Sequence, residues 1–97
     1  MTQIAIEGDP STQQDAPLTE ANCDDTVTYE GKLVAVVNGA LEPTHNHGDT
    51  QYISAPSEGS NSVTIAGNKI HRVGDGRTCG THKTDHLGEP RTVNIFD

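Results

Sequence analysis

A short strand followed by the pair Gly-Asp recurs along this chain and limits its possible folds more than any other feature. The pair stands at Gly8-Asp9, Gly48-Asp49 and Gly74-Asp75. Hairpin patterns in residues 35–39 and 63–67 precede the second and third pairs, and residues 93–95 with 4–6 form a divided hairpin before the first. Gly-Asp is a common turn dipeptide, so one pair alone would predict nothing. Read as a circle, the sequence has three copies of one unit, which predicts pseudo-threefold symmetry and chain ends that meet.

Strand patterns separated by tight turns run through the whole chain. The strongest is Lys32–Val37, which follows residues 26–29 across Glu30-Gly31 and stops at Asn38-Gly39, a dipeptide favoured in hairpins. Further strands are predicted over residues 3–6, 62–66, 69–73 and 91–96, with a turn at Gly67-Asn68. The one weak helical candidate is Asp15–Asn22. The pattern predicts an all-β fold of short strands and tight turns.

The chain is poor in material for a hydrophobic core. Of its 97 residues 31% are hydrophobic, with one Phe, two Tyr and no Trp. A domain of this size and composition is marginal unless a disulfide, a metal or a partner stabilises it. The net charge of −8 would also suit disorder, but the alternating strands favour a folded chain. We expect one domain over residues 1–97, with residues 10–28 as a loop insertion.

The distribution of charge excludes several classes of partner. No Lys or Arg precedes Lys32, and the acidic chain has no basic stripe. Nucleic acids and anionic membrane surfaces are bound through clustered cations, so neither is expected as a binding partner. No apolar run reaches about 18 residues, and the first ten residues lack a signal-peptide pattern. We therefore expect synthesis in the cytoplasm, where Cys23 and Cys79 stay reduced.

Histidine and cysteine side chains gather in one part of the sequence. All five histidines lie between residues 45 and 86, with Cys79 among them. Imidazole and thiolate are the ligands that zinc prefers, and four of them in a tetrahedron form a closed structural site. His45 and His47 leave the same face of a strand, and the two-residue gap between Cys79 and His82 lets one turn present both donors.

The Gly-Asp repeat adds a geometric reason for a shared site. His45 lies three residues before Gly48, as His71 lies three before Gly74, so copies around one axis would bring both towards it. The predicted site takes four ligands from the candidates His45, His47, His71, Cys79 and His82, with His45 and His47 in competition. The thiol favours zinc, and iron is the alternative. His86 is predicted to be a surface histidine, and Cys23 a small buried apolar residue.

An ordered series of motifs runs from Gly59 to Gly80. It comprises Gly-Ser…Val-x-Ile-x-Gly over residues 59–67, Arg72-Val-Gly-Asp75 and Cys79-Gly80. Together they resemble the signature of the PAAR-repeat family, although only Arg72 matches strictly within the Pro-Ala-Ala-Arg tetrapeptide. Residues 4–10 resemble the family's opening Gly-Asp segment and His47-Gly48 its central His-Gly. The family's opening His is missing, with Gln13 near its place, and residues 11–31 are unmatched.

The resemblance implies a definite function. Members of this family form a short cone of three β-hairpins, with zinc near the apex held by three His and one Cys. The base binds the blunt end of a trimeric β-helical spike, one tip per trimer, in phage tails and type VI secretion machines. The point helps to pierce the target's outer membrane. A chain of 97 residues without an appended toxin domain is more similar to a bare phage-type tip. We therefore predict a structural protein with no enzymatic activity and no small-molecule substrate.

Two other functions fit part of the pattern. One is a small zinc-stabilised β module for another partner. The other is a metal-dependent hydrolase with three protein ligands, a bound water and a base such as Asp75, Asp85 or Glu89. The chain is too short to wall a substrate cleft, and four or five candidate ligands indicate a closed site. Four-coordinate metal without water, and one chain per spike trimer, would distinguish the tip from both.

Overall fold

The computed structural model describes residues 2–11, 17–42, 45–47, 50–79, 83–85 and 94–95, and of residues 2, 45–47, 52 and 94–95 only the backbone. Short strands and a single 3₁₀ turn make up its regular structure. They are β1 (Thr2–Gln3), η1 (Glu20–Asn22), β2 (Cys23–Tyr29), β3 (Lys32–Ala35), β4 (His45–His47), β5 (Thr50–Tyr52), β6 (Thr64–Ile65), β7 (Asn68–Lys69) and β8 (Asn94–Ile95). The fold is all-β, as predicted. The predicted loop over residues 10–28 ends early, because β2 begins at Cys23.

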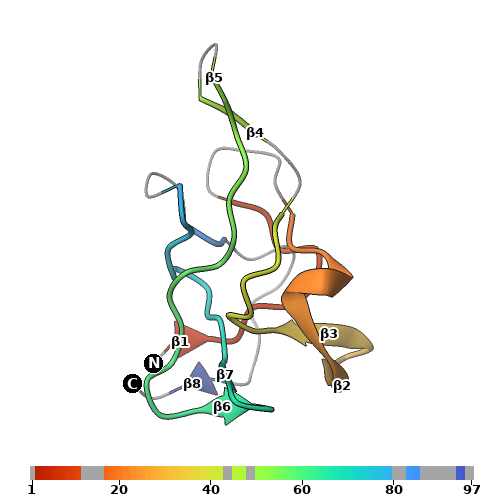
Figure 1. The fold of residues 1–97 in the computed structure, drawn as a ribbon. Coiled ribbons are helices and arrows are strands. Elements are labelled where there is room, and N and C mark those ends of the chain that lie inside the picture. The colour runs from red at the N-terminus through yellow and green to blue at the C-terminus, as the bar shows by residue number, and fades with distance from the viewer. Residues whose placement is uncertain are drawn as a thin grey trace.

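The two-stranded sheets of the described chain are all antiparallel, and β2–β3, β4–β5 and β6–β7 are hairpins of consecutive strands. The turns of β2–β3 and β6–β7 have positive φ angles at both central residues, 49° and 82° at Glu30-Gly31 and 52° and 85° at Ala66-Gly67. Such angles belong to the type I′ turn, whose twist matches that of the strands. The turn predicted at Gly67-Asn68 therefore lies one residue earlier. The predicted pairing between the two ends of the chain is present, and β1 lies beside β8 (Figure 1), but its residues differ from the prediction. Thr2 and Gln3 pair with Ile95 and Asn94, whereas residues 4–6, predicted as the second strand of this divided hairpin, bridge to Arg72 and Val34.

Three segments that continue from β1, β3 and β7 hydrogen-bond to one another in a closed cycle. The N–H of Ala5 donates to the carbonyl of His71 (3.0 Å), His71 to Ala35 (3.0 Å), and Ala35 to Ala5 (2.9 Å). A second cycle has N···O distances of 2.9 Å for Glu7 to Leu33, Val37 to Lys69 and Val73 to Gln3. Bridges join Ile6 to Val34, Val36 to Ile70, and Ile4 to Arg72. We call this arrangement the central ring; each segment contacts the other two in the same way.

The central ring corrects the alignment of the sequence repeat. The Gly-Asp spacing predicted that His45 is the counterpart of His71, whereas the ring places Ala35 opposite Ala5 and His71. The reason is that β3 forms a hairpin with the preceding strand, β2, through the turn at Glu30-Gly31. Residues 27–36 therefore form the second copy of the repeat. Asn38-Gly39 then stands where Gly8-Asp9 and Gly74-Asp75 stand, and it forms a bend in place of the predicted hairpin turn. Gly48-Asp49 lies outside the described residues.

A small apolar core lies in the central ring. Ile4, Val34 and Ile70, each one residue before its ring position, are buried together. Partly buried Ile6, Tyr29 and Ile65 pack against them. A second cluster, beside the first, contains Ala5, Leu18, Cys23 and Ala35. Few apolar side chains are buried among the described residues, so this core alone supplies limited stability.

The β4–β5 hairpin projects from the rest of the described chain (Figure 1). It lies at the end opposite to the paired termini, and the longest dimension of the molecule is 37 Å, against 28 and 24 Å across. The molecule therefore has two distinct ends. One carries the turns of β2–β3 and β6–β7 with the termini, and the other carries β4–β5.

Candidate functional site

The two Gly-Asp turns that the structure describes are built in the same way. The carboxylate of Asp9 accepts the N–H of Ile6 and that of Asp75 accepts the N–H of Arg72, both at 2.9 Å. Gly8 and Gly74 have φ angles of 91° and 92°, a region that favours glycine. Their N–H groups donate to the carbonyls of Leu18 and Thr84, both at 2.7 Å. The chain therefore leaves the central ring along matching paths in two of the three copies.

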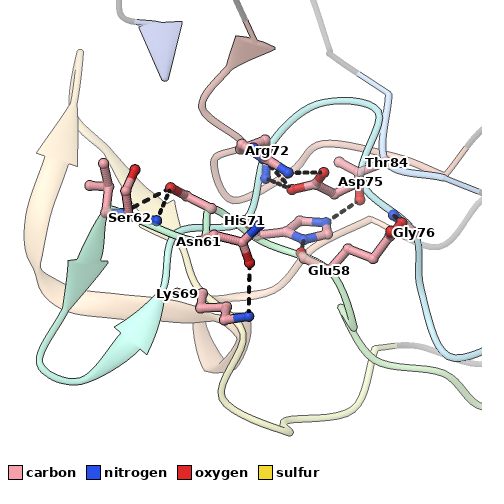
Figure 2. Close-up of polar contacts among 11 residues, drawn as sticks. Glu58, Asn61, Ser62, Lys69, His71, Arg72, Asp75, Gly76 and Thr84 are labelled. Atoms are coloured by element: carbon pink, nitrogen blue, oxygen red, sulfur yellow. Dashed lines mark hydrogen bonds and ion pairs between the residues drawn. The ribbon is translucent and has the colours of Figure 1, made fainter. Parts of the chain in front are cut away.

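His71 lies at the centre of this region and is fully buried. Its Nδ1 lies 2.7 Å from the carbonyl oxygen of Glu58, which can only accept, so Nδ1 carries the proton. Its Nε2 lies 2.6 Å from Oγ1 of Thr84 and accepts the hydroxyl proton (Figure 2). Burial is the main cause that lowers the pKa of His71, although the Glu58 carbonyl opposes the shift. Both ring nitrogens are thus engaged by protein groups.

Arg77 forms a buried ion pair with Glu42, and both side chains have 0% exposure. Nη1 of Arg77 donates to Oε1 of Glu42 at 3.1 Å, and the hydroxyl of Ser54 donates to the same oxygen at 2.7 Å. Nε of Arg77 donates to Oγ1 of Thr84 at 2.9 Å, and Nη2 to the carbonyl of Asp9 at 3.3 Å. Since the Thr84 hydroxyl donates to His71, one polar network runs from Ser54 to the centre of the ring.

Three of the sequence-predicted ligands follow the two residues of this ion pair along the chain: Cys79 follows Arg77, and His45 and His47 follow Glu42. Cys79 is free, half-buried and two residues after Arg77. His45 and His47 lie in β4, three and five residues after Glu42. His82 and His86 lie outside the described residues. Among the described residues no three His, Cys, Asp or Glu side chains converge to hold a metal ion. The metal site stays a prediction.

Cys23 differs from Cys79 in its surroundings. It is buried in the second apolar cluster, and its Sγ donates to the carbonyl of Thr19 at 3.4 Å. Burial, with the nearby carboxylates of Glu7, Asp9 and Glu20, raises the pKa of the Cys23 thiol to about 12. A neutral thiol in such a place behaves as a small apolar side chain, as predicted.

The structure describes two of the three carboxylates that were candidates for the base of a hydrolase, Asp75 and Asp85. Oδ2 of Asp75 accepts from the N–H and Nε of Arg72, and Oδ1 from Nη2 of Arg72 (Figure 2). Asp85 is exposed, and its N–H donates to the carbonyl of Pro10. Glu89 lies outside the described residues. Asp75 thus has a structural role in its turn.

Sequence reasoning missed Glu42 and Arg77. A single charged residue in a turn-rich segment normally lies on the surface, so neither residue stands out by type. Their contact spans 35 residues of sequence and depends on how the second and third copies pack. Thr84 was missed for the same reason. No local sequence pattern indicates that Glu42, Arg77 and Thr84 are buried together.

Comparison with known proteins leaves the motif resemblance without further support. No protein-family model matches the chain, and no curated protein is significantly similar to it. In the part of the chain that the structure describes, no helix has the length and apolar character needed to cross a membrane. The function is therefore argued from the motifs and the geometry.

Proposed function

We propose that this chain is a structural tip that caps a trimeric β-helical spike of a contractile injection machine. The observation that carries the proposal is the central ring, in which Ala5, Ala35 and His71 exchange equivalent hydrogen bonds. A trimeric spike ends in three equivalent strand edges, which are prone to unwanted pairing unless they are covered. One chain with three similar hairpins covers all three edges with matching surfaces. The two hairpins closed by type I′ turns and the divided hairpin form the base of the proposed cone.

Exposed valines at matched positions support this use of the base. Val27 lies two residues before Tyr29, and Val63 two residues before Ile65. Val27 is 38% exposed and Val63 36%, so both can contact a partner. Val93 holds the corresponding place in the divided hairpin and lies outside the described residues. We propose that these three valines contact the three subunits of the spike.

The opposite end carries the proposed metal site. Because both nitrogens of His71 bind protein groups, the four remaining candidates form the ligand set: His45, His47, Cys79 and His82. Three imidazoles and one thiolate suit zinc better than iron. Zinc held by four protein ligands supplies a cross-link worth on the order of 10 kcal/mol and leaves no open position for catalysis. This end is the narrow point that meets the target's outer membrane when the machine contracts, in a phage tail or a type VI-like apparatus.

Spike binding tests the proposal through two exposed positions. The variant Val27→Asp with Val63→Asp should lose co-purification with a trimeric β-helical spike protein that the unchanged chain binds, because the variant places charge on the contact. Leu41→Asp is the matched control, since Leu41 is 61% exposed but precedes the β4–β5 hairpin. The control should bind like the unchanged chain. Binding that survives in the double variant would contradict the proposed base.

Metal content tests the ligand set separately. Cys79→Ser with His82→Ala should reduce zinc below one equivalent per chain and lower the melting temperature sharply, because two of four ligands are lost. Cys23→Ala is the control and should keep its zinc, since Cys23 lies in the second apolar cluster. Full zinc content in the double variant would refute the assignment.

A further inference from the structure

The half of the molecule beyond the central ring is held by polar contacts. Three connections leave the ring. The structure describes residues 8–11 and 17–22 of the first, residues 38–42, 45–47 and 50–62 of the second, and residues 74–79 and 83–85 of the third. Their buried side chains include Asp9, Ser11, Glu42, Ser54, Arg77 and Thr84. The buried apolar cluster of Ile4, Val34 and Ile70 lies in the ring itself, and the described parts of the connections bury few apolar side chains, namely Leu18 and Ala55. The connections therefore need another source of cohesion.

The guanidinium of Arg77 meets all three connections. Nη2 donates to the carbonyl of Asp9 in the first, Nη1 to the carboxylate of Glu42 in the second, and Nε to the hydroxyl of Thr84 in the third. The carbonyl of Asp9 also accepts the N–H of Leu18, so the contact reaches the far end of the first connection. A rigid fork of five N–H donors suits this geometry, and a lysine does not.

We infer that Arg77 is a positioning residue that joins the three connections before any metal binds. In doing so it brings the stem of β4 and the residues around Cys79 together, because Glu42 lies three residues before His45 and Arg77 two before Cys79. The joint between the connections depends on the buried contacts alone. Its consequence for the ligands rests on the proposed function.

Hydrogen exchange of single amides tests the joint in chelator-treated protein. In Arg77→Met the N–H groups of Leu18, Glu42 and Thr84, one in each connection, should lose about a hundredfold of their protection, since a buried partner is left unpaired. The ring N–H groups of Ala5 and Ala35 should keep theirs. Unchanged protection in the connections, or an equal loss in the ring, would overturn the inference.

Two further variants separate joining from simple charge neutralisation. The double variant Arg77→Met with Glu42→Gln also removes the buried charge of Glu42, which has no counter-charge once Arg77 is replaced. Its melting temperature should therefore recover partly, while the amides of the three connections stay unprotected from exchange. Full recovery of protection would show that Arg77 only neutralises Glu42, against the inference. Arg77→Lys serves if the methionine variant does not fold, and should lose protection in the first and third connections.

Arg72→Met is the matched control. Arg72 also forms an ion pair that is largely buried, but with Asp75, three residues away in the same turn. Protection at Leu18 and Glu42 should therefore stay as in the unchanged chain. Loss at these two sites in Arg72→Met would mean that any buried arginine has this effect, which contradicts a special role for Arg77.

Zinc titration gives the second readout. Loss of the positioning contact should weaken zinc binding about tenfold or more in Arg77→Met, as for other residues that orient ligands. If the unchanged chain binds no zinc, the proposed metal site fails while the exchange data still decide the role of Arg77. If chelation alone removes protection from the connections of the unchanged chain, the metal is the joint and the inference is wrong.

Discussion

Acid should destabilise this protein through His71. The imidazole is fully buried, and the hydroxyl of Thr84 donates to Nε2 of its neutral form. A proton on Nε2 would face the hydroxyl of Thr84, whose Oγ1 already accepts Nε–H of Arg77, so the hydroxyl proton would have to leave its present partner. Burial thus lowers the pKa of His71 in the folded chain.

The direction and size of the effect follow from proton linkage. Above pH about 6.5, His71 is neutral in both the folded and the unfolded chain, so its full contribution to stability is present. Below that pH the unfolded chain takes up a proton that the folded chain refuses, and stability falls until the lower folded pKa is reached. At pH 5.5 the free energy of unfolding should have lost about 1.4 kcal/mol, if the folded imidazole is still neutral.

Urea unfolding measures this loss. The free energies of unfolding at pH 7.5, 6.5 and 5.5 are compared between the unchanged chain and His71→Gln, both with chelator, because zinc affinity also depends on pH. The other histidines are common to both chains and cancel in the difference. The variant should be less stable at pH 7.5 but show a shallower fall towards pH 5.5. Parallel curves would refute the account of His71.

Three further outcomes are expected. Gly59→Ala should lower the free energy of unfolding by about 1–3 kcal/mol, because the added Cβ would lie 2.7 Å from the carbonyl oxygen of Ile70. In the control Gly31→Ala the Cβ meets no atom within 4 Å, and the loss should be about 1 kcal/mol because φ is positive there. Urea unfolding measures both losses, and equal losses would contradict the close approach at Gly59. Ile70→Ala should cost about 2–5 kcal/mol in the same assay, and a negligible loss would mean that the ring core is not packed as described. An alkylating reagent should modify Cys79 well before Cys23, because burial and the raised pKa keep Cys23 a neutral thiol. Mass spectrometry follows the two reactions, and faster reaction at Cys23 would contradict its place in the core.

Much of the strand arrangement follows from local sequence rules. Alternation and the dipeptides Glu30-Gly31 and Ala66-Gly67 set two hairpins, because glycine takes the positive φ of a type I′ turn readily. The divided hairpin was predicted from the similarity of Val93-Asn-Ile95 to Val63-Thr-Ile65. The repeat thus indicates that the two ends of the chain pair, but the partner of β8 is β1 (Thr2–Gln3) in place of the predicted residues 4–6.

The second copy of the repeat cannot be aligned by its Gly-Asp dipeptide, because strand spacing places it elsewhere. Gly48-Asp49 matches the other two pairs by type, but the matching strand pattern is Val27-Thr-Tyr29, directly before a type I′ turn. In the ring, Asn38-Gly39 replaces Gly-Asp. Turn dipeptides are frequent, so spacing from the turn to the ring residue is the better guide.

The polar network could not be predicted. The partners of His71 lie 13 residues away on either side, and those of Arg77 up to 68 residues away. A sequence shows that a histidine can bind a metal or a hydrogen-bond partner, but the choice depends on which groups the fold brings within reach. The tautomer of His71 is settled only by the acceptor at Glu58.

Stoichiometry tests the central claim most directly, because a chain with three equivalent hairpins should cover all three subunits of a spike at once. The native mass spectrum of the complex with the trimeric β-helical protein gives the number of chains bound. We predict a single species of one chain on three spike subunits. Three chains per trimer, or no complex at all, would contradict the assignment as a spike tip.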